Sequence, residues 1–286
     1  MNKVKVICDS TIDLNQDMYE ALDVAVIPLS INFGEDAYDD GTEITPDQMY
    51  KMIEEKGELP HTAAAVPLKI EEVFRKYIDE GYDIIFTGIG SKLSSTIQNA
   101  NIAKNAIEGA SDRIFILDSN NLSSASGLLV MKMCKYRNEG KSAKEIYDLV
   151  LPLVPMVSAQ FAVDKLDYLH KGGRCSGASK IFGHILHIHP VIKVVDGGMI
   201  VYKKPRGKLK AGIDEQILEL KNDLPNVDMD NIMITDSGVS DEDKQYFHDE
   251  VAKLVDPNII RHTRAGCVIS CHCGPGTIGV LYIKTK

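Results

Sequence analysis

The sequence predicts an α/β protein made of two α/β domains, the first of them organised around a parallel sheet. Three segments of the first half follow one plan: a short apolar run, then small, acidic or hydroxyl-bearing residues, then a helical pattern. The apolar runs are residues 4–7, 83–87 and 113–117. Repeated βα units of this kind form parallel sheets. The pattern of strand and helix signals changes from about Ser158, so we expect domains at residues 1–157 and 158–286.

Four helices are expected in the first half. The first begins near Asp13, and the second, third and fourth cover about 46–55, 94–107 and 127–136. Between the second of these and the next helix, residues 57–67 contain Pro60, three consecutive alanines and Pro67. Such a composition predicts an irregular linker. Thr62 lies in this linker without large neighbours and is by itself an ordinary loop threonine.

Composition and charge narrow the classes of function. The chain has 286 residues, is 44% hydrophobic and carries a formal net charge of −9. Nucleic acid and anionic membrane are therefore not expected as main partners, because both require a basic surface. The apolar runs are too short to span a membrane, and the first residues read as a strand rather than a signal peptide. Six cysteines in a chain of this length do not make a disulfide framework, so we expect a cytoplasmic protein.

A dense group of hydroxyl residues stands where the third helix of the first half is expected to begin. Four hydroxyl residues lie within a span of six positions: Ser91, Ser94, Ser95 and Thr96. Unpaired backbone N–H groups and the positive end of the helix dipole favour an anion at such a place. Ordinary helix capping accounts for any single one of these residues. The group as a whole favours a carboxylate or phosphate ligand.

The second half contains a double glycine beside an arginine, Gly172-Gly173-Arg174, at the end of a helical turn. Paired glycines allow a left-handed helix terminus, and an arginine there can bind an anion with two hydrogen bonds. A surface helix end with a solvated arginine is the alternative. Further along, Asp196-Gly197-Gly198 between two apolar runs predicts a hairpin. The basic run at 203–210 is either a solvated loop or a docking surface for an acidic partner.

The segment from His272 to Gly279 is the most informative feature of the chain. It reads HCGPGTIG, with Cys267 to Cys271 before it and Val280 to Ile283 after it. Both flanking runs are expected to be strands. Gly274, Pro275 and Gly276 predict a tight turn with little side-chain cover. A histidine at the edge of such a turn can approach a ligand closely, so His272 is a candidate site residue.

Two clusters resemble metal sites: His184, His187 and His189, and Cys267, Cys271 and Cys273. The histidines have no HExxH pattern and the cysteines no CxxC spacing. Read as a strand, the cysteine segment puts all three thiols on one face, which favours core packing. We expect no metal and no cofactor.

The chain resembles the DegV family of fatty-acid-binding proteins. The matching residues occur in the family's order and span nearly the whole chain: Asp9-Ser10-Thr11 with Asp13-Leu14, Pro60, Thr62 and Pro67, Ser91-Lys92-Leu93-Ser94 with Thr96, Asp118-Ser119, Leu166, Tyr168-Leu169 and Lys171 to Arg174, Pro190 with Lys193, and His272 with Gly274 to Thr277 and Gly279.

The resemblance implies two α/β domains, the first related in fold to dihydroxyacetone kinase, with the ligand at the domain interface. It implies a non-catalytic carrier that buries one long-chain fatty acid in a tunnel. The carrier presents the carboxylate to the catalytic subunit of a fatty acid kinase, which makes an acyl phosphate with ATP. Transient membrane contact is compatible with this role. No cofactor is implied beyond the bound fatty acid.

Transferred to this sequence, the family's pattern assigns carboxylate binding to Thr62, Ser94 and His272. Arg174 is expected at the mouth, facing the partner or the incoming phosphate. A second layer around the ligand is expected from Ser91, Ser95, Gly274 and Gly276.

The sequence departs from the family's pattern in three places. Ala63-Ala64-Ala65 replace polar residues after Thr62, which removes a hydrogen-bond donor; Ser95 stands where glycine is usual, and His189 where lysine is common.

Two alternatives to the carrier stay open at this point. The first is a stand-alone phosphotransferase or hydrolase acting on a small polar substrate, with His272 as base or nucleophile. No P-loop and no nucleophile elbow supports it. The second is a metal-dependent protein that uses His184, His187 and His189.

Overall fold

The computed structural model describes residues 2–164, 166–176 and 188–286. The first half contains a four-stranded parallel sheet in the order β2-β1-β6-β7. Its strands are β1 (Lys3–Asp9), β2 (Val24–Ile27), β6 (Tyr82–Gly88) and β7 (Ile114–Asp118). The three predicted strands are therefore present and parallel, and the predicted α/β class is confirmed.

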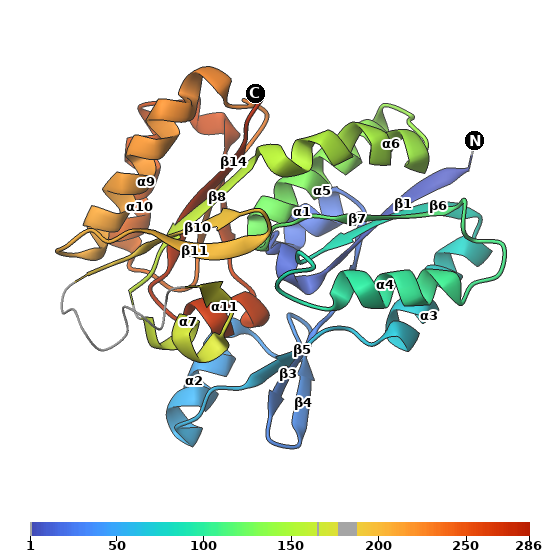
Figure 1. Cartoon of the computed structure of the whole chain (residues 1–286), viewed down its shortest axis with the longest axis horizontal. Coiled ribbons are helices and arrows are strands. Elements are labelled where there is room, and N and C mark those ends of the chain that lie inside the picture. The colour runs from blue at the N-terminus through green and yellow to red at the C-terminus, as the bar shows by residue number, and fades with distance from the viewer. Residues whose placement is uncertain (1, 165, 177–187) are drawn as a thin grey trace.

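Six helices accompany this sheet in the described part of the first half. They are α1 (Gln16–Ala21), α2 (Pro46–Lys56), α3 (Pro67–Asp79), α4 (Thr96–Asn105), α5 (Ser123–Asn138) and α6 (Ala143–Val150), preceded by the short 3-10 helix η1 (Ser10–Ile12). Figure 1 shows α3 and α4 on one side of the sheet, with α1, α5 and α6 on the other. Burial of α5 explains its weak amphipathic pattern, because even Ser124 and Ser126 are fully buried.

A small antiparallel sheet extends from this layer, in the order β4-β3-β5. Its strands are β3 (Ser30–Phe33), β4 (Asp36–Asp39) and β5 (His61–Ala63). Strand β5 corrects the expectation of an irregular linker at 57–67. Thr62 lies in that strand, paired in register with Ile31 of β3. Pairing with β3, the neighbour of this edge strand, forms a strand that the composition alone does not mark.

The second half contains a seven-stranded mixed sheet in the order β13-β12-β14-β8-β10-β11-β9. Its strands are β8 (Val157–Ala162), β9 (Cys175–Ser176), β10 (Val191–Val195), β11 (Gly198–Lys203), β12 (Ile232–Asp236), β13 (Ile260–Arg264) and β14 (Ile278–Ile283). The predicted hairpin is present as β10 and β11. The expected boundary between residues 157 and 158 falls at the start of β8 and stays a prediction.

Four helices belong to the described part of this half: α7 (Leu166–Gly172), α9 (Leu209–Asp223), α10 (Asp241–Ala252) and α11 (Cys267–Cys273). Two 3-10 turns, η3 (Leu224–Asn226) and η4 (Pro257–Ile259), complete the described part of this half, and η2 (Leu151–Met156) precedes β8. In Figure 1, α9 and α10 lie on the outer side of the sheet, whereas α7 and α11 lie toward the small sheet of the first half. None of the helices in the described ranges is long and apolar enough to cross a membrane.

Helix α11 corrects the prediction of a strand at Cys267 to Cys271. A five-residue apolar run fits a buried helix as well as a strand. Here contacts with the rest of the fold determine that it forms a helix. Cys267, Cys271 and Cys273 are all buried, so the expectation of core packing is correct although the element is different.

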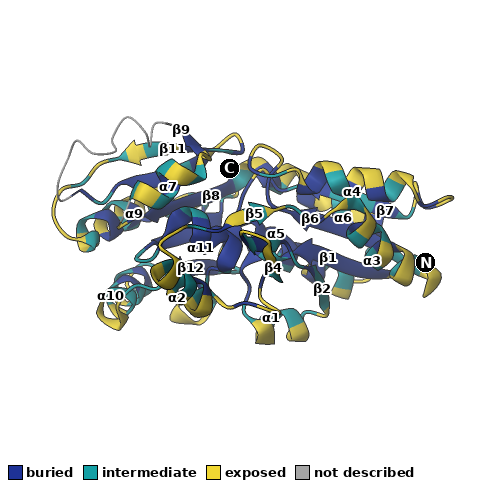
Figure 2. Ribbon diagram, turned by 90° about the horizontal axis from the view of Figure 1, so that it is seen from below, coloured by how far each residue is buried: buried dark blue, intermediate teal, exposed yellow. Residues whose placement is uncertain are grey.

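One hydrophobic cluster runs through both halves and includes Val6 of β1 and Phe161 of β8. A second cluster lies wholly in the second half, around Phe247 and Tyr282. Figure 2 shows the buried strands of both large sheets side by side, with α11 between them and the exposed residues on the outer helices. The continuous core holds the two sheets against each other around the region where α5, α11 and β5 meet.

Candidate functional site

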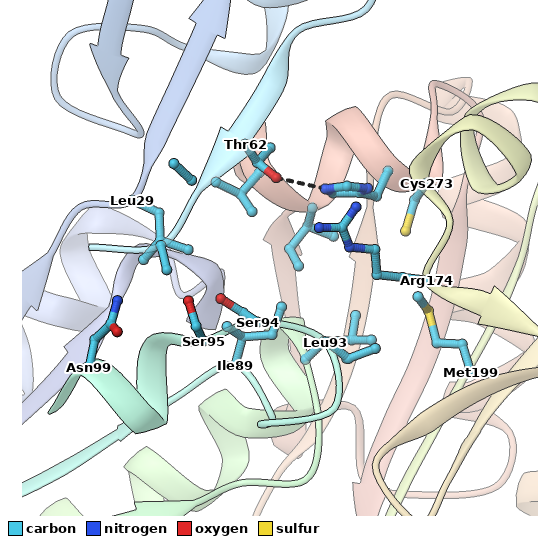
Figure 3. Close-up of a pocket in the computed structure, with 16 residues that line it drawn as sticks. Leu29, Thr62, Ile89, Leu93, Ser94, Ser95, Asn99, Arg174, Met199 and Cys273 are labelled. Carbon is cyan, nitrogen blue, oxygen red and sulfur yellow. Dashed lines mark hydrogen bonds between the residues drawn. The ribbon is translucent and has the colours of Figure 1, made fainter. Parts of the chain in front are cut away.

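A cavity of about 400 Å³ lies between the two halves of the chain. Most of its lining is apolar, and the polar side chains of Thr62, Ser94, Ser95, Asn99 and Arg174 lie around it (Figure 3). The lining residues are Leu29, Thr62, Ala63, Ala64, Ile89, Leu93, Ser94, Ser95, Asn99, Leu122, Arg174, Met199, Val268, Ile269, His272 and Cys273. Residues 89–95 directly follow β6, so the cavity lies at the carboxyl end of the parallel sheet, where open α/β sheets bind ligands.

The polar part of the cavity centres on a hydrogen bond between Thr62 of β5 and His272 of α11. Thr62 Oγ1 and His272 Nε2 are 2.8 Å apart (dashed line in Figure 3). Burial, assisted by the positive charge of Arg174, lowers the pKa of His272 to about 4. The imidazole is therefore neutral at pH 7. A neutral imidazole beside a hydroxyl can relay a hydrogen bond to a carboxylate without adding a buried charge of its own.

The other ring nitrogen of His272 is tightly enclosed. Nδ1 is buried and has no hydrogen-bond partner among the residues described. A methyl group built on Gly172 would lie 2.5 Å from it. Only glycine at the end of α7 leaves room for this ring, which gives a physical role to the first member of the predicted double glycine.

Ser94 and Ser95 approach the cavity from the start of α4. The Ser94 hydroxyl is 3.0 Å from Thr96 Oγ1 and accepts from the Thr96 N–H at 3.3 Å. Ser95 is the N-cap residue of α4, but its side chain makes no capping hydrogen bond. The Ser95 hydroxyl can therefore turn toward a ligand while the helix start stays formed, and the Ser94 hydroxyl can donate its proton to a ligand while its oxygen still accepts from the Thr96 N–H.

Ser91, Gly274 and Gly276 do not line this cavity. Ser91 is exposed, and its backbone N–H donates to Asp118 Oδ1 at 3.1 Å. Gly274 ends α11, and a methyl group there would lie 2.7 Å from the Tyr168 ring. The corresponding distance at Gly276 is 2.7 Å to Asp164. In this structure the two glycines allow the residues around α7 to pack closely, and their expected place in a second layer stays a prediction.

Arg174 lies where the cavity meets an outer cleft. It is exposed, and its Nη1 donates to the carbonyl oxygen of Gly172 at 2.6 Å. Figure 3 shows Arg174 reaching in from the side opposite Ser94 and Ser95. The outer cleft, also of about 400 Å³, is lined by Gly57, Glu58, Leu59, Pro60, His61, Thr62, Lys171, Gly172, Arg174, Cys271 and His272. Three residues, Thr62, Arg174 and His272, thus border both spaces.

The apolar wall was not predicted residue by residue. Val268, Ile269, His272 and Cys273 all line the cavity. Their spacing of one, four and five residues places them on one face of a helix, so reading Cys267–Cys273 as a helix would have indicated them. Ala63 and Ala64, noted above as departures, form part of the wall beside Thr62.

Metal-like clusters are not assembled in the described ranges. His184 and His187 lie outside the described residues. His189 Nδ1 is 3.4 Å from Asp164 Oδ1. Among the residues described, no group of three or more His, Cys, Asp or Glu side chains could hold a metal ion.

The basic run at 203–210 is partly neutralised within the chain. Lys203 pairs with Glu215 at 2.6 Å. Lys210 lies over the ring of Tyr246, 3.8 Å from its centroid.

Solved structures with this fold come from several bacteria. A DegV family protein from Thermus thermophilus, described by its fatty acid binding, has a TM-score of 0.89 and 28% identity, with 99% of each chain covered. A DegV lipid-binding protein from Thermotoga maritima has a TM-score of 0.87 and 26% identity over 99% of each chain. A stearic acid-binding protein from Eubacterium ventriosum has a TM-score of 0.86 and 25% identity, covering 99% of this chain and 98% of its own.

Proteins of similar sequence carry the same family description. A DegV domain-containing protein of Clostridium acetobutylicum is 32% identical over 291 residues, with 99% of each chain covered. One of Clostridium perfringens is 32% identical over 286 residues, again with 99% of each chain covered. The family model described as "Uncharacterised protein, DegV family" matches residues 3–285. The chain belongs to the DegV family.

Proposed function

We propose that this protein binds one long-chain fatty acid between its two halves and presents the carboxylate to a partner kinase for acyl phosphate formation. The observation that carries the proposal is the cavity itself: a mainly apolar space that has Thr62, Arg174 and His272 where it meets an outer cleft. A volume of about 400 Å³ falls within the range typical of small-molecule sites. Three structural neighbours at 25–28% identity are described as fatty-acid-, lipid- or stearic-acid-binding.

The carboxylate is assigned to the junction of the cavity and the outer cleft. A buried carboxylate needs several hydrogen-bond donors, because an unpaired charge in an apolar environment is very costly. Thr62 and His272 supply a hydroxyl and an imidazole group there, the exposed Arg174 supplies a positive charge, and Ser94 adds a hydroxyl from within the cavity. The outer cleft leads from this junction to solvent, which gives a kinase a route to the carboxylate.

The acyl chain is assigned to the apolar part of the cavity. A small pocket of about 30 Å³, which shares Leu122, Ile269 and Cys273 with the cavity, continues it toward Phe161 and Leu281. Each methylene removed from water contributes about 0.8 kcal/mol, so the tail supplies most of the affinity. The proposal makes the protein a non-catalytic carrier in the cytoplasm, where its kinase has ATP.

A kinase-coupled assay tests this assignment. The protein is supplied with oleate, ATP and a fatty acid kinase catalytic subunit, and acyl phosphate is measured as the hydroxamate. Thr62→Ala combined with Ser94→Ala is expected to lower the rate at least about tenfold, because hydrogen bonds to a charged group are lost. Ser111→Ala, an exposed hydroxyl in a turn, is the matched control. Full activity of the double variant would contradict the assignment.

The alternative, a hydrolase or phosphotransferase with His272 as base, receives one supporting observation. The Thr62–His272 contact of 2.8 Å has the geometry of a nucleophile and its base. A pKa of about 4, however, makes the imidazole a weak base near neutral pH, and Nδ1 has no orienting acceptor among the described residues. Turnover of ATP or an acyl ester by the isolated protein would favour this alternative.

A further inference from the structure

Helix α11 lies in sequence between β13 and β14 of the second half, yet its polar contacts are largely with the first half. Its thiols donate to two carbonyl oxygens there: Cys267 Sγ to Ile44 and Cys271 Sγ to Pro60, both at 3.3 Å. At its last turn, His272 bonds to Thr62. Burial raises the pKa of both thiols well above the usual range of cysteine, so they are protonated donors rather than reactive thiolates.

The start of α11 is held by two buried carboxylates of the first half. Asp13 Oδ1 accepts from the N–H of Gly266 at 2.8 Å, and Asp40 Oδ1 accepts from the N–H of Cys267 at 2.8 Å. Gly266, the N-cap residue of the helix, provides no side chain of its own. The two carboxylates therefore replace the missing cap and complement the positive end of the helix.

The second oxygen of each carboxylate also accepts a hydrogen bond. Ser123 Oγ donates to Asp13 Oδ2, and Ser10 Oγ donates to Asp40 Oδ2 at 2.9 Å. The two aspartates are each only 3% exposed. A buried group held on both oxygens has little freedom. Holding the helix start therefore also fixes the position of His272, which lies less than two turns further along.

We propose that Asp13 and Asp40 are positioning residues for the binding site: by holding the start of α11 against the first half, they keep His272 in contact with Thr62 and keep Val268 and Ile269 in the cavity wall. They do not touch the cavity. The effect on ligand binding rests on the proposed function, whereas the effect on His272 does not.

Gly266 supplies a way to disturb this contact without removing a carboxylate. Its φ of −65° and ψ of 177° suit any residue. A methyl group there would lie 3.1 Å from Asp13 Oδ1 and 3.3 Å from Asp40 Oδ2. The branched side chain of Gly266→Val should therefore push the helix start away from both carboxylates.

The experiment compares Asp40→Ala, Asp40→Asn and Gly266→Val with the unchanged protein. The first readout is the protonation state of His272, from nitrogen NMR shifts of labelled histidine without ligand at about pH 5.5, with His272→Gln for assignment. The second readout is the affinity for carbon-13 carboxyl-labelled oleate. Asp83→Ala is the control, because Asp83 pairs with Arg113 at 3.0 Å and does not contact α11.

Asp40→Ala and Gly266→Val are expected to expose the imidazole, so that it becomes largely protonated, and to weaken oleate binding at least about tenfold. Asp40→Asn keeps an acceptor for the Cys267 N–H and should restore both readouts, and Asp83→Ala should change neither. If Asp40→Ala does not fold, Gly266→Val decides. A neutral imidazole and unchanged affinity in Gly266→Val would overturn the inference. If the unchanged protein binds no oleate, the proposed function fails, and the NMR readout alone still decides on the positioning role.

Discussion

The two walls of the cavity differ in how firmly the rest of the chain holds them. On one side, α4 begins with Ser94 and Ser95, whose hydroxyls are partly exposed and weakly committed within the chain. On the other side, α11 is attached to the first half at both ends and carries an imidazole that burial keeps neutral. The difference teaches that one wall adapts to the ligand while the other is fixed by the fold. Changes on the α11 side should therefore alter stability and binding together, and changes on the α4 side should alter binding alone.

The largest effect is expected from acid, acting on the fixed wall. The unfolded His272 imidazole takes up a proton as the pH falls through about 6.5, whereas the folded protein does so only near 4. The unfolded state therefore binds more protons in this window, and the free energy of unfolding contributed by His272 falls with falling pH, by up to about 3 kcal/mol. Urea unfolding between about pH 7 and pH 4 measures it.

The control for this measurement is His272→Asn, because other groups titrate in the same window. Burial raises the pKa of Asp9 to about 6, which stabilises the folded state as the pH falls and so opposes the histidine. Subtracting the pH dependence of the variant isolates His272. Two parallel curves would show that this imidazole is not held in a depressed state.

A second test of the fixed wall is Gly172→Ala. The added methyl group would lie 2.5 Å from His272 Nδ1, and overpacking of this kind costs roughly 1–3 kcal/mol. We expect a lower Tm and at least about tenfold weaker binding of oleate. In Gly198→Ala the nearest atom would be 3.7 Å away, so that variant should behave like the unchanged protein. Equal behaviour of the two variants would contradict the close packing of α7 against His272.

A smaller effect is expected on the adaptable wall. Ser94→Ala and Ser95→Ala should each weaken oleate binding by roughly three- to tenfold, the value of one hydrogen bond, with Tm unchanged. Calorimetric titration and thermal unfolding of the same samples measure both quantities. A clear fall in Tm for Ser95→Ala would mean that its hydroxyl supports the fold rather than the ligand.

The smallest effect is expected from chelation of metals. Because the histidines have no HExxH pattern and the cysteines no CxxC spacing, treatment with EDTA should leave both Tm and oleate affinity unchanged. If elemental analysis found stoichiometric metal in the untreated protein, and EDTA removed it with a loss of stability, the result would support a metal site at His184, His187 and His189.

The same contrast explains which parts of the structure could be predicted from the sequence. The βα units of the first half and the start of α4 were predictable, because strand, turn and helix signals are local there. Thr62, Ser94, Ser95, Arg174 and His272, which the family resemblance assigns to the ligand site, all line the cavity, and their roles in binding stay predictions.

The remaining parts depend on contacts that no local pattern contains. The cysteine-rich run forms a helix because Asp13 and Asp40, more than 220 residues away in the chain, satisfy its first N–H groups. Thr62 lies in a strand because β3 pairs with its backbone. Short apolar segments of this kind take their structure from the surrounding fold.

The most direct test of the central claim is lipid extraction. The purified protein is denatured, extracted with organic solvent and analysed by mass spectrometry, with His272→Gln and the Thr62→Ala, Ser94→Ala double variant treated in parallel. The account predicts close to one fatty acid per chain in the unchanged protein and much less in the variants. A lipid-free extract from well-folded protein would contradict fatty acid binding and direct attention to a small polar ligand around Ser94 and His272.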